Sequence, residues 1–405
     1  MNPRRYLLCC EQYTPSVGGV QEVMRQVAER LVGRGHSVTV ATRAHPQRAA
    51  EAWINGVRIV SFQVDGNAVR GLRGEVAAYR SFLSEESADA ILIKAAQQWT
   101  FDAAVEVLPT MLCRKIFIPC GFSGLHNPIY ADYFREMPRW LALFDALIVY
   151  SLTYQDAEFA RRCGMAHALH LIANGADERE FADSEAGDIR QRLGIEPGDD
   201  LLLSVGSLIA AKGHWEVLEA YDAANLPRPA TLVVNGNVPG GHPFAGLKRM
   251  LKHLASGRLP LNWEARLLNR RHRGAETRRR VVLVDLPRPD LVALYKAADL
   301  FVFASHVEYS PLVLFEAAAS ATPFISSDVG NAREIAKWTG AGVVVSGHPV
   351  FSRTELVESL TDTLASILRN KLTLDQLRAS ARRNIFERGF TWNRIVKQYE
   401  TLLNG

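Results

Sequence analysis

The stretch that decides the fold is A-A-D-L-F-V-F-A-S-H-V-E-Y-S-P-L-V-L-F-E-A-A-A-S-A-T-P-F-I-S-S-D-V-G-N-A-R-E, residues 297–334. Its apolar run 300–304 is typical of a strand that is covered on both faces. Ser310 followed by Pro311 predicts a helix start, with Ser310 as the N-cap and Pro311 at the first helical position. Residues 312–320 are helix formers, and residues 324–327 after the Thr-Pro pair indicate the next strand. A strand, a helix and a strand in this order predict a parallel sheet.

The join between this strand and this helix carries a predicted anion site. The amides of Leu312 and Val313 fall in the first helical turn, where they have no partner within the helix. Free N–H groups and the positive end of the helix dipole together suit a pyrophosphate. Glu308 lies in the loop before the helix and Glu316 inside the helix, with seven residues between them.

The pattern E-x7-E after a short apolar strand, followed by E-A, a Pro-bearing break and D-V-G-x-x-x-E, resembles a known family. It is similar to the retaining nucleotide-sugar glycosyltransferases of family 4, also called glycosyl transferases group 1. The resemblance implies that Glu316 binds the ribose hydroxyls and that Glu308 lies by the donor sugar. A carboxylate is a good acceptor for vicinal hydroxyls, so these roles are physically sensible. The alternative is two ordinary glutamates near a helix start, which the helix dipole also favours.

The resemblance implies an α/β protein with the GT-B fold, in which two doubly wound Rossmann-like domains face a central cleft. We expect an acceptor-side domain at 1–180, to which the last helix, 391–405, returns. We expect a donor-binding domain at 181–390, a linker within 183–200 and a basic insertion near 242–280. A length of 405 residues agrees with two or three domains.

Composition limits the classes of protein that remain. The formal net charge of +4 permits an anionic partner but requires none. The five cysteines show no C-x-x-C spacing, which argues against a zinc site and a disulfide framework and favours a reducing compartment. No apolar run approaches ~18 residues, so we expect no transmembrane helix and a cytoplasmic protein. No Asp-x-Asp pair stands at a predicted strand end, so we expect neither a metal nor another cofactor.

Two positions in the first half are candidates for the active site. Gly18 and Gly19 lie between a strand and a helix, and similar transferases carry a Gly-Gly loop here that faces the donor phosphates and the acceptor cleft. The alternative for this pair is a simple tight turn. Many relatives have a His directly after the strand at 115–119, where this chain has Cys120, so His126 is the nearest histidine that could act near the donor sugar. His126 could equally be a loop histidine, and the sequence gives no evidence for a reactive thiolate at Cys120.

The first strand of the second half ends in G-S-L-I-A-A-K-G, where relatives show G-R-L-x-x-x-K-G with both cations on the diphosphate. Lys212 is therefore predicted to contact the phosphates, against the alternative of a solvated lysine at a helix start. Ser207 stands where the relatives have Arg, and a hydroxyl offers one donor in place of five.

The base of the nucleotide is expected beside the ends of the next two strands. Asn235 and Gly236 end the strand at 231–234 on the cleft side. Asp285 and Leu286 follow the strand at 281–284, where relatives use the backbone near the base.

Residues 264–280 hold seven Arg against two Glu, a local charge of +5. Three interpretations stay open, namely a solvated loop, contact with an anionic acceptor or a membrane phosphate, and nucleic-acid binding, the last without a recognised module. The second interpretation predicts a peripheral position on the inner face of the membrane, and we expect no nucleic-acid partner.

We therefore expect a retaining glycosyltransferase that moves a sugar from a UDP- or GDP-sugar to a hydroxyl of a glycan or lipid-linked acceptor, in cell-surface polysaccharide or glycolipid biosynthesis. Two alternatives remain. One is a non-catalytic nucleotide-sugar-binding or partner protein, which the Ser207 and Cys120 departures favour. The other is a GT-B epimerase or hydrolase that needs no acceptor.

Overall fold

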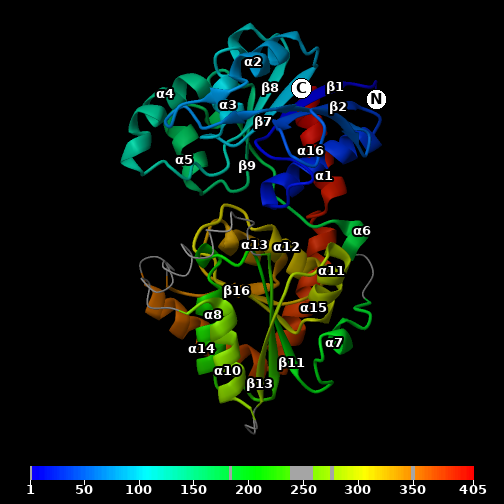
Figure 1. Ribbon diagram of the computed structural model, residues 1–405, viewed down its shortest axis with the longest axis vertical. Helices are drawn as coiled ribbons and strands as arrows, with labels where there is room; N and C mark the ends of the chain where they lie inside the picture. Colours follow the sequence, from blue (N-terminus) through cyan, green and yellow to red (C-terminus); the bar gives the residue numbers. More distant parts are fainter. Residues whose placement is uncertain (1, 182–184, 238–258, 274–277, 348–351) are drawn as a thin grey trace. The chain divides into compact units, whose positions relative to one another are not determined.

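The computed structural model describes residues 2–181, 185–237, 259–273, 278–347 and 352–405 (Figure 1). The chain forms two compact units, which are described separately below. The first comprises residues 1–174 and 392–405, and the second comprises residues 175–391. The sequence predicted the boundary at 180, six residues later than the structure has it.

The first unit contains an eight-stranded sheet in the order β10-β9-β8-β7-β1-β2-β4-β3. All neighbours pair in parallel except β3 and β4. The strands are β1 Arg5–Cys9, β2 Ser37–Arg43, β3 Glu51–Ile54, β4 Val57–Phe62, β7 Ala90–Lys94, β8 Arg114–Ile118, β9 Ala146–Val149 and β10 Leu169–Leu171, and a separate short hairpin is formed by β5 Val64–Asp65 and β6 Arg73–Gly74.

Helices cover this sheet because their apolar residues recur at helical spacing. In α1, for example, Val23, Met24, Val27 and Leu31 are all buried. The last helix, α16, lies beside α1 although it comes from the far end of the chain (Figure 1). The helices of the first unit are α1 Gly19–Gly33, α2 Val76–Glu85, α3 Trp99–Ala104, α4 Ala131–Leu141, α5 Gln155–Arg162 and α16 Trp392–Asn404, with short 3-10 turns at η1 Leu108–Thr110, η2 Pro128–Tyr130 and η3 Ala166–Ala168.

The second unit contains a six-stranded, fully parallel sheet in the order β13-β12-β11-β14-β15-β16. Its central strands are continuous apolar runs, as expected for strands that helices cover on both faces. The strands are β11 Asp200–Val205, β12 Ala230–Asn235, β13 Arg279–Val284, β14 Leu300–Phe303, β15 Phe324–Ser326 and β16 Gly342–Val344.

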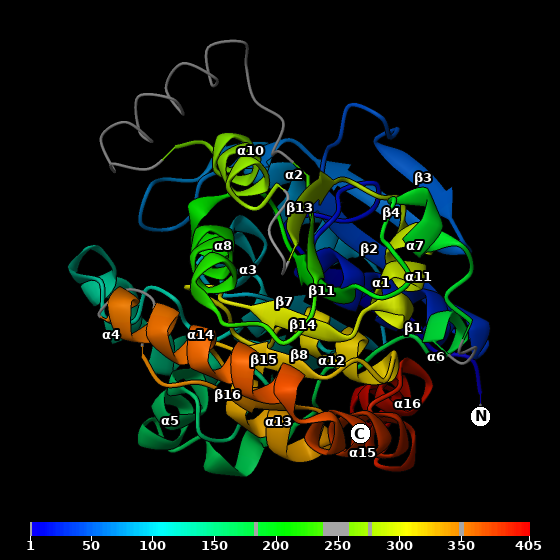
Figure 2. The ribbon, with the colours of Figure 1, turned by 90° about the horizontal axis from the view of Figure 1, so that it is seen from below.

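Figure 2 shows α8, α10 and α14 along one face of this second sheet and α11, α12 and α13 along the other. The sheet and its two helical layers make a doubly wound α/β unit, as the sequence predicted. The helices are α6 Glu178–Phe181, α7 Ile189–Arg192, α8 His214–Ala223, α10 Leu261–Arg271, α11 Arg288–Ala297, α12 Leu312–Ala319, α13 Ala332–Thr339, α14 Arg353–Arg369 and α15 Lys371–Glu387, with a 3-10 turn at η4 Ala210–Lys212.

The predicted linker at 183–200 differs from the structure in its described part. Arg192 in α7 pairs with Asp290 at 2.6 Å, and Arg190 lies 3.4 Å from Asp299. Residues 185–200 are therefore anchored on the second unit, while residues 182–184 lie outside the described residues. Sequence polarity indicated a linker because these charged side chains face partners that lie far away along the chain.

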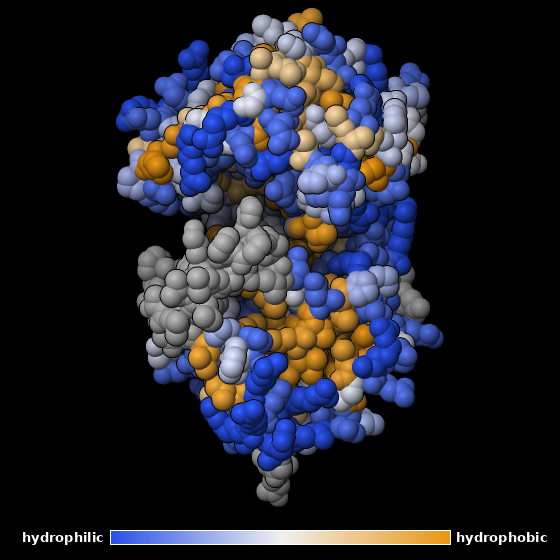
Figure 3. All heavy atoms as spheres, viewed as in Figure 1, coloured by the Kyte–Doolittle hydropathy of each residue, from blue (hydrophilic) through white to orange (hydrophobic). Residues whose placement is uncertain are grey.

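The edge strand β13 is only half buried over most of its length. Figure 3 shows apolar residues at the surface of the second unit in the region of this strand. Asn269 of α10 covers part of the edge, because its side chain both donates to the carbonyl oxygen of Val281 and accepts from the Val281 amide. Such side-chain capping limits pairing of an edge strand with another chain.

Candidate active site

The second sheet reverses its strand order between β11 and β14. The chain runs from β11 outward to β12 and β13, then returns to β14 on the other side of β11. The loops after the two strands at such a point lead away from each other and leave a crevice at the carboxyl edge of the sheet. Ser207 and Lys212 follow β11, and residues 308–313 follow β14. These predicted site residues therefore flank the switch point.

Lys212 and Glu308 form an ion pair across this point. The Lys212 Nζ atom lies 2.5 Å from Glu308 Oε1. The Ser305 hydroxyl donates to the same carboxylate oxygen at 3.0 Å. The side chains of Lys212 and Glu308 are 28% and 18% exposed, so a ligand can reach both.

The backbone explains why the two side chains meet. Gly213 adopts a left-handed conformation (φ 67°) that begins α8, and a Cβ atom there would lie 1.8 Å from the carbonyl oxygen of Ala304. The amide of His306 donates to the carbonyl oxygen of Ala211 at 2.8 Å. The K-G pair in the sequence thus lets the turn that carries Lys212 pack directly on the loop that carries Glu308.

Helix α12 begins one residue later than the sequence predicted. Pro311, with φ −69° and ψ 114°, occupies the N-cap, and Leu312 is the first helical residue. The prediction of Ser310 as N-cap was therefore wrong, because proline fixes φ but leaves ψ free to be extended. Leu312 and Val313 still occupy the first two helical positions, where amides lack an intrahelical acceptor.

The D-V-G segment, residues 328–330, packs against the loop before α12. Gly330 has a left-handed φ of 54°, and a Cβ atom there would lie 2.3 Å from the carbonyl oxygen of Tyr309. The Asn331 amide donates to the same oxygen at 2.9 Å. Glycine at 330 is thus required for the approach that fixes the loop carrying Glu308.

Glu316 is buried and makes an ion pair with an arginine that the sequence did not single out. Arg288 Nη2 lies 2.7 Å from Glu316 Oε1 and 2.5 Å from Glu180 Oε2. Its guanidinium also lies over the Phe181 ring, 5.7 Å from the centroid. Burial would lower the pKa of Arg288, but the two carboxylates outweigh it and raise that pKa, so the side chain stays charged.

One sequence signal could have indicated Arg288. It is the first residue of α11, where the positive end of the helix dipole disfavours a cation. An arginine there needs a carboxylate partner, although the sequence alone does not say which one.

The residues predicted beside the base are brought together by hydrogen bonds. The Asn235 side-chain oxygen accepts from the Leu286 amide at 3.0 Å, and the Gly236 amide donates to the Val284 carbonyl oxygen at 2.8 Å. A Cβ atom at Gly236 would lie 1.8 Å from the carbonyl oxygen of Gly206. The side chain of Asp285 is exposed. The loops after β11, β12 and β13 therefore form one connected edge.

His214 lies next to this edge but does not supply a second cation. Burial lowers its pKa to about 4, so the imidazole is neutral at neutral pH. Its Nδ1 lies 3.2 Å from the Ser204 hydroxyl and its Nε2 lies 3.2 Å from the Gly206 carbonyl oxygen. His214 thus supports the loop that contains Ser207 and does not replace the missing arginine.

Three predicted residues belong to the first unit. Gly18 is the N-cap of α1 in an extended conformation, and Gly19 is the first residue of that helix. His126 is exposed in the loop after β8. Burial raises the pKa of the Cys120 thiol, which does not favour a thiolate nucleophile there.

Four of the seven arginines in the predicted basic segment, residues 264–280, contact other residues of the second unit. Arg271 pairs with Asp222, Arg278 lies 2.9 Å from Asp199, and Arg279 donates to backbone carbonyls at the end of α8. Arg280 donates to the carbonyl oxygen of Gly194. These contacts leave the predicted membrane contact unsupported, while residues 242–258 and 274–277 lie outside the described ranges.

The described ranges show neither a membrane-spanning helix nor a cluster of metal ligands. They contain no helix that is both long and apolar enough to cross a bilayer. Within the same ranges, no group of three or more His, Cys, Asp or Glu side chains is placed to hold a metal ion.

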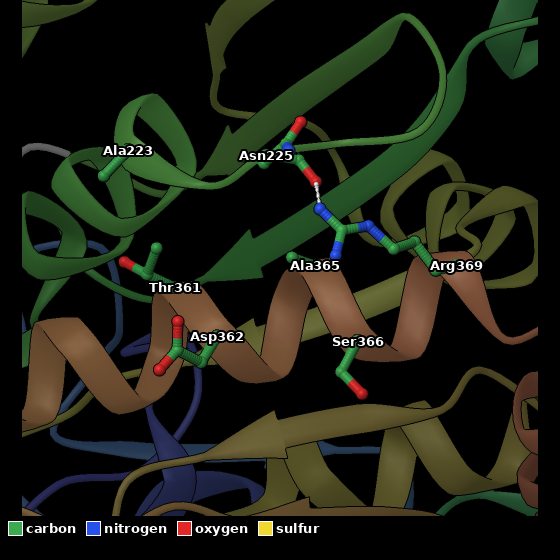
Figure 4. A pocket seen from close by; sticks show the side chains of 7 residues that line it. All are labelled: Ala223, Asn225, Thr361, Asp362, Ala365, Ser366 and Arg369. Carbon is green, nitrogen blue, oxygen red and sulfur yellow. Dashed lines mark hydrogen bonds between the residues drawn. The ribbon is translucent and has the colours of Figure 1, made fainter.

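A cavity of about 400 Å³ lies between the end of α8 and α14 (Figure 4). Its charged lining residues are Asp362 and Arg369, and Arg369 donates to the backbone oxygen of Asn225 at 2.9 Å. Helix α8 runs from the end of β11 back toward the start of β12, so this cavity lies at the amino edge of the sheet. Ligands of parallel sheets bind at the opposite edge, and we place no active site here.

Two family models match the chain. The model described as "Glycosyltransferase Family 4" matches residues 17–180, and the model described as "Glycosyl transferases group 1" matches residues 185–384. Together they account for both units.

The curated relatives that match the chain are glycosyltransferases. The chain is 27% identical over 237 residues to a D-inositol 3-phosphate glycosyltransferase of Nocardia farcinica, covering 58% of this chain and 48% of the relative. It is 26% identical over 275 residues to D-inositol 3-phosphate glycosyltransferase 1 of Catenulispora acidiphila, covering 65% and 59%. The chain thus spans about half the length of the first curated relatives it matches.

Solved structures define the fold class. Sucrose-phosphate synthase of Thermosynechococcus elongatus superposes with a TM-score of 0.73 at 20% identity, covering 98% of both chains. HepE of Anabaena in complex with UDP gives a TM-score of 0.69 at 18% identity, covering 99% of both chains. The fold is GT-B, as the sequence predicted. With both family models matched, this chain belongs to glycosyltransferase family 4, a family of transferases.

Proposed function

We propose that this protein is a retaining glycosyltransferase that moves a sugar from a UDP- or GDP-sugar to a hydroxyl of a glycan or lipid-linked acceptor. The observation that carries the proposal is the Lys212–Glu308 pair at the switch point of the second sheet, beside the N-terminus of α12. A cation and two helix-start amides suit a diphosphate, and a carboxylate suits sugar hydroxyls.

Leaving-group stabilisation is the main catalytic contribution in this proposal. Lys212, the amides of Leu312 and Val313 and the Ser207 hydroxyl stabilise the charge that develops on the departing diphosphate. Glu308 exchanges its contact with Lys212 for hydroxyls of the donor sugar. Glu316 accepts from the ribose hydroxyls, and Arg288 holds its carboxylate in place through the ion pair at 2.7 Å.

The proposed transfer needs no protein nucleophile. The bond from the anomeric carbon to the diphosphate oxygen breaks, and the acceptor oxygen forms its bond on the same face of the sugar. The acceptor proton passes to the departing diphosphate. The raised pKa of Cys120 agrees with this scheme, as does the exposed position of His126. The scheme is metal-independent and requires no cofactor.

We place the reaction on the cytoplasmic side, in the biosynthesis of a cell-surface polysaccharide or glycolipid. The absence of C-x-x-C spacing among the five cysteines supports a reducing compartment. The proposal includes peripheral contact with the membrane through the basic segment 264–280, in which Arg271, Arg278, Arg279 and Arg280 bind residues of the second unit.

One alternative keeps specific support, namely a nucleotide-sugar-binding protein without transferase activity. Ser207 removes a cation that relatives place on the diphosphate, and Cys120 stands where many have a histidine. Such a protein would bind the nucleotide and release no product, whereas an epimerase or hydrolase would turn over without an acceptor.

The test is turnover of a UDP- and GDP-sugar panel by the purified protein with chelator present. We expect nucleoside diphosphate release that depends on an acceptor glycoside, together with an anomeric configuration in the product equal to that of the donor by NMR. Binding without release would favour the non-catalytic protein. Inversion of the anomeric centre, or activity that requires added metal, would contradict the scheme above.

A further inference from the structure

The chain enters the second unit through a short segment that reaches the Arg288–Glu316 ion pair. The second unit begins at Gly175, and helix α6, Glu178–Phe181, follows almost at once. Helix α6 packs against both α11 and α12 (Figure 1). Arg288 is the first residue of α11, and Glu316 lies within α12. The entry segment therefore lies beside both members of the ion pair.

Glu180 of α6 engages Arg288 more fully than Glu316 does. The Nε and Nη2 atoms of Arg288 donate to Glu180 Oε2 at 3.1 and 2.5 Å, which is a forked contact. Within the described residues, Nη2 alone faces Glu316, at 2.7 Å from its Oε1 atom. The guanidinium also lies over the ring of Phe181, the next residue of α6. Two consecutive residues of α6 thus fix the orientation of Arg288.

This orientation leaves one oxygen of Glu316 open. The ion pair with Arg288 uses Oε1, and Oε2 accepts no hydrogen bond from any residue in the described ranges. Oε2 is not sealed off from solvent, in contrast to the Tyr295 hydroxyl of α11, which is buried without a partner. The Glu316 side chain is 11% exposed, so the open oxygen lies at the surface of an otherwise buried group. A carboxylate oxygen with free lone pairs can accept from vicinal hydroxyls.

A forked contact between Arg288 and Glu316 would close this oxygen. Guanidinium and carboxylate groups prefer the geometry in which two N–H groups meet both oxygens. Without the carboxylate of Glu180, the Nε and Nη2 atoms of Arg288 would be free to form this fork with Glu316. Ribose hydroxyls would then compete with charge-assisted hydrogen bonds, which are roughly twice as strong as neutral ones. Glu180 prevents this competition because it already occupies Nε.

The charges of these three side chains act in the same direction. One guanidinium faces two carboxylates, so the cluster retains an excess of negative charge for hydroxyl donors. A neutral side chain at position 180 would leave one guanidinium and one carboxylate, whose charges cancel. Hydroxyl groups form stronger hydrogen bonds with an ionised acceptor, so this excess charge favours the contact of Glu316 with ribose.

The alternative is a purely structural role for Glu180. Arg288 begins α11, where the positive end of the helix dipole disfavours a cation, and Glu180 would then serve only to offset that charge. Such a role predicts a loss of stability when Glu180 is replaced. It predicts no effect that depends on the hydroxyls of the ribose. Ligands that differ in one ribose hydroxyl therefore separate the two roles.

We infer that Glu180 is a positioning residue for nucleotide recognition, which holds Arg288 so that Glu316 keeps one oxygen for the vicinal hydroxyls of the ribose. Glu180 itself does not touch the nucleotide in this arrangement. The inference rests on the proposed function, because the contact of Glu316 with ribose belongs to that proposal. It makes nucleotide affinity depend on the segment through which the chain enters the second unit.

The experiment is calorimetric titration of the full-length protein with UDP, GDP and their 2′-deoxy counterparts, without metal. The measured quantity is the Kd of the 2′-deoxynucleotide divided by the Kd of the ribonucleotide. We expect this ratio to be about ten or more in the wild type for UDP or GDP, because a site built for a hydroxyl rejects a ligand that lacks it.

Two variants test the role of Glu180. Glu180→Gln should lower the ratio below about three by weakening the ribonucleotide, because Arg288 then competes for the open oxygen of Glu316, while the Kd of the 2′-deoxynucleotide changes less than about twofold. Arg179→Gln, at an exposed position of the same helix, is the matched control and should keep the wild-type ratio. The melting temperature of each variant without ligand shows that it is folded.

The inference is overturned if Glu180→Gln keeps the wild-type ratio. It is also overturned if this variant weakens both nucleotides equally, which is the result that a purely structural role predicts. Equal binding of both forms to the wild type would contradict the ribose contact of Glu316, and the inference with it, while nucleotide binding itself would stand. If the wild type binds neither UDP nor GDP, the proposed function is contradicted together with the inference.

Discussion

At the residue scale, Lys212 is the side chain on which the proposed chemistry depends most. Replacing Lys212 with alanine removes a cation beside the predicted diphosphate site. We expect Lys212→Ala to lower kcat about 100-fold or more, as loss of a single transition-state donor does. The measurement is steady-state release of nucleoside diphosphate.

Stability should hardly change in the same variant. The Lys212–Glu308 pair is partly exposed, and such pairs contribute about 1 kcal/mol or less. Lys337→Ala, which removes an exposed lysine of α13, is the matched control and should keep full activity. Full activity of Lys212→Ala would contradict the proposal that Lys212 stabilises the departing diphosphate.

A second residue-scale prediction concerns His214 and pH. Its folded pKa of about 4 lies below the ordinary 6.5, so between these values the unfolded chain binds a proton that the folded protein does not. The free energy of unfolding must therefore fall as the pH is lowered through this window, by up to about 1.4 kcal/mol per pH unit.

His214→Gln should remove this part of the pH dependence. Glutamine can still meet the Ser204 hydroxyl and the Gly206 carbonyl oxygen, but it does not titrate. Urea unfolding at pH 4.5, 5.5 and 6.5 checks the prediction. If the wild type and the variant lose stability in parallel over this range, His214 is not the titrating group.

Sequence and structure agree best where a residue's role is local. The K-G pair and the E-x7-E spacing could be read from the chain because each motif fixes its own loop or helix start. Arg288 could not be identified, since its partner Glu180 lies 108 residues away and only tertiary packing brings them together. The pairing of Lys212 with Glu308, 96 residues apart, was likewise not predicted as a contact.

At the element scale, the buried parallel strands were predictable because each is a continuous apolar run. Strand β3 was missed for the opposite reason. It is an antiparallel edge strand whose residues alternate between exposed and half-buried, with Trp53 69% exposed, so it lacks that signal. The short hairpin of β5 and β6, two residues in each strand, was too short to give any pattern.

Helix α16 gives a testable element-scale prediction through Glu400. This buried carboxylate accepts hydrogen bonds from Arg34 at 2.7 Å and lies 2.8 Å from His36 Nε2. Burial acts to raise the pKa of Glu400, but Arg34 and His36 outweigh it and lower that pKa. Its stabilisation is therefore present above the unfolded value and is lost as the pH falls through the folded one.

We expect Glu400→Gln to lower the free energy of unfolding by about 1.5–3 kcal/mol at pH 7, because Arg34 and the buried His36 lose their hydrogen bonds to a charged acceptor. The effect should shrink in acid, where the wild-type carboxylate is protonated as well. Denaturant unfolding measures both values. Gln398→Ala, on the exposed face of the same helix, is the control. A loss below about 0.5 kcal/mol would show that this cluster does not hold α16.

At the scale of the whole molecule, the last helix belongs to the unit that contains the first strand. In α16, Trp392, Ile395, Val396, Tyr399 and Leu403 are buried. Burying each large apolar side chain contributes about 1.5–3 kcal/mol, so their sum is comparable to the stability of a whole domain. The return of the last helix to the first unit was predicted only through the family resemblance. An amphipathic pattern shows that one face of a helix is buried, but not against which element.

In a chain that ends at Thr391, the first unit should therefore unfold and the second unit should stay folded. Limited proteolysis followed by mass spectrometry should show rapid cleavage within 2–174 and a protected fragment close to 175–391. The full-length chain provides the reference pattern. Equal protection of the two units in the shortened chain would contradict the assignment of α16.

The central claim is that the second unit binds a nucleoside diphosphate at the switch point between β11 and β14. The most direct measurement is the melting temperature of the full-length protein with UDP, GDP or ADP and their sugars, without metal. A ligand at ~100 times its Kd should add about 2.7 kcal/mol to the free energy of unfolding. We predict a rise with one nucleotide that Glu316→Ala and Lys212→Ala both abolish and Lys337→Ala keeps. No rise with any nucleotide, or an equal rise in all the variants, would contradict the claim.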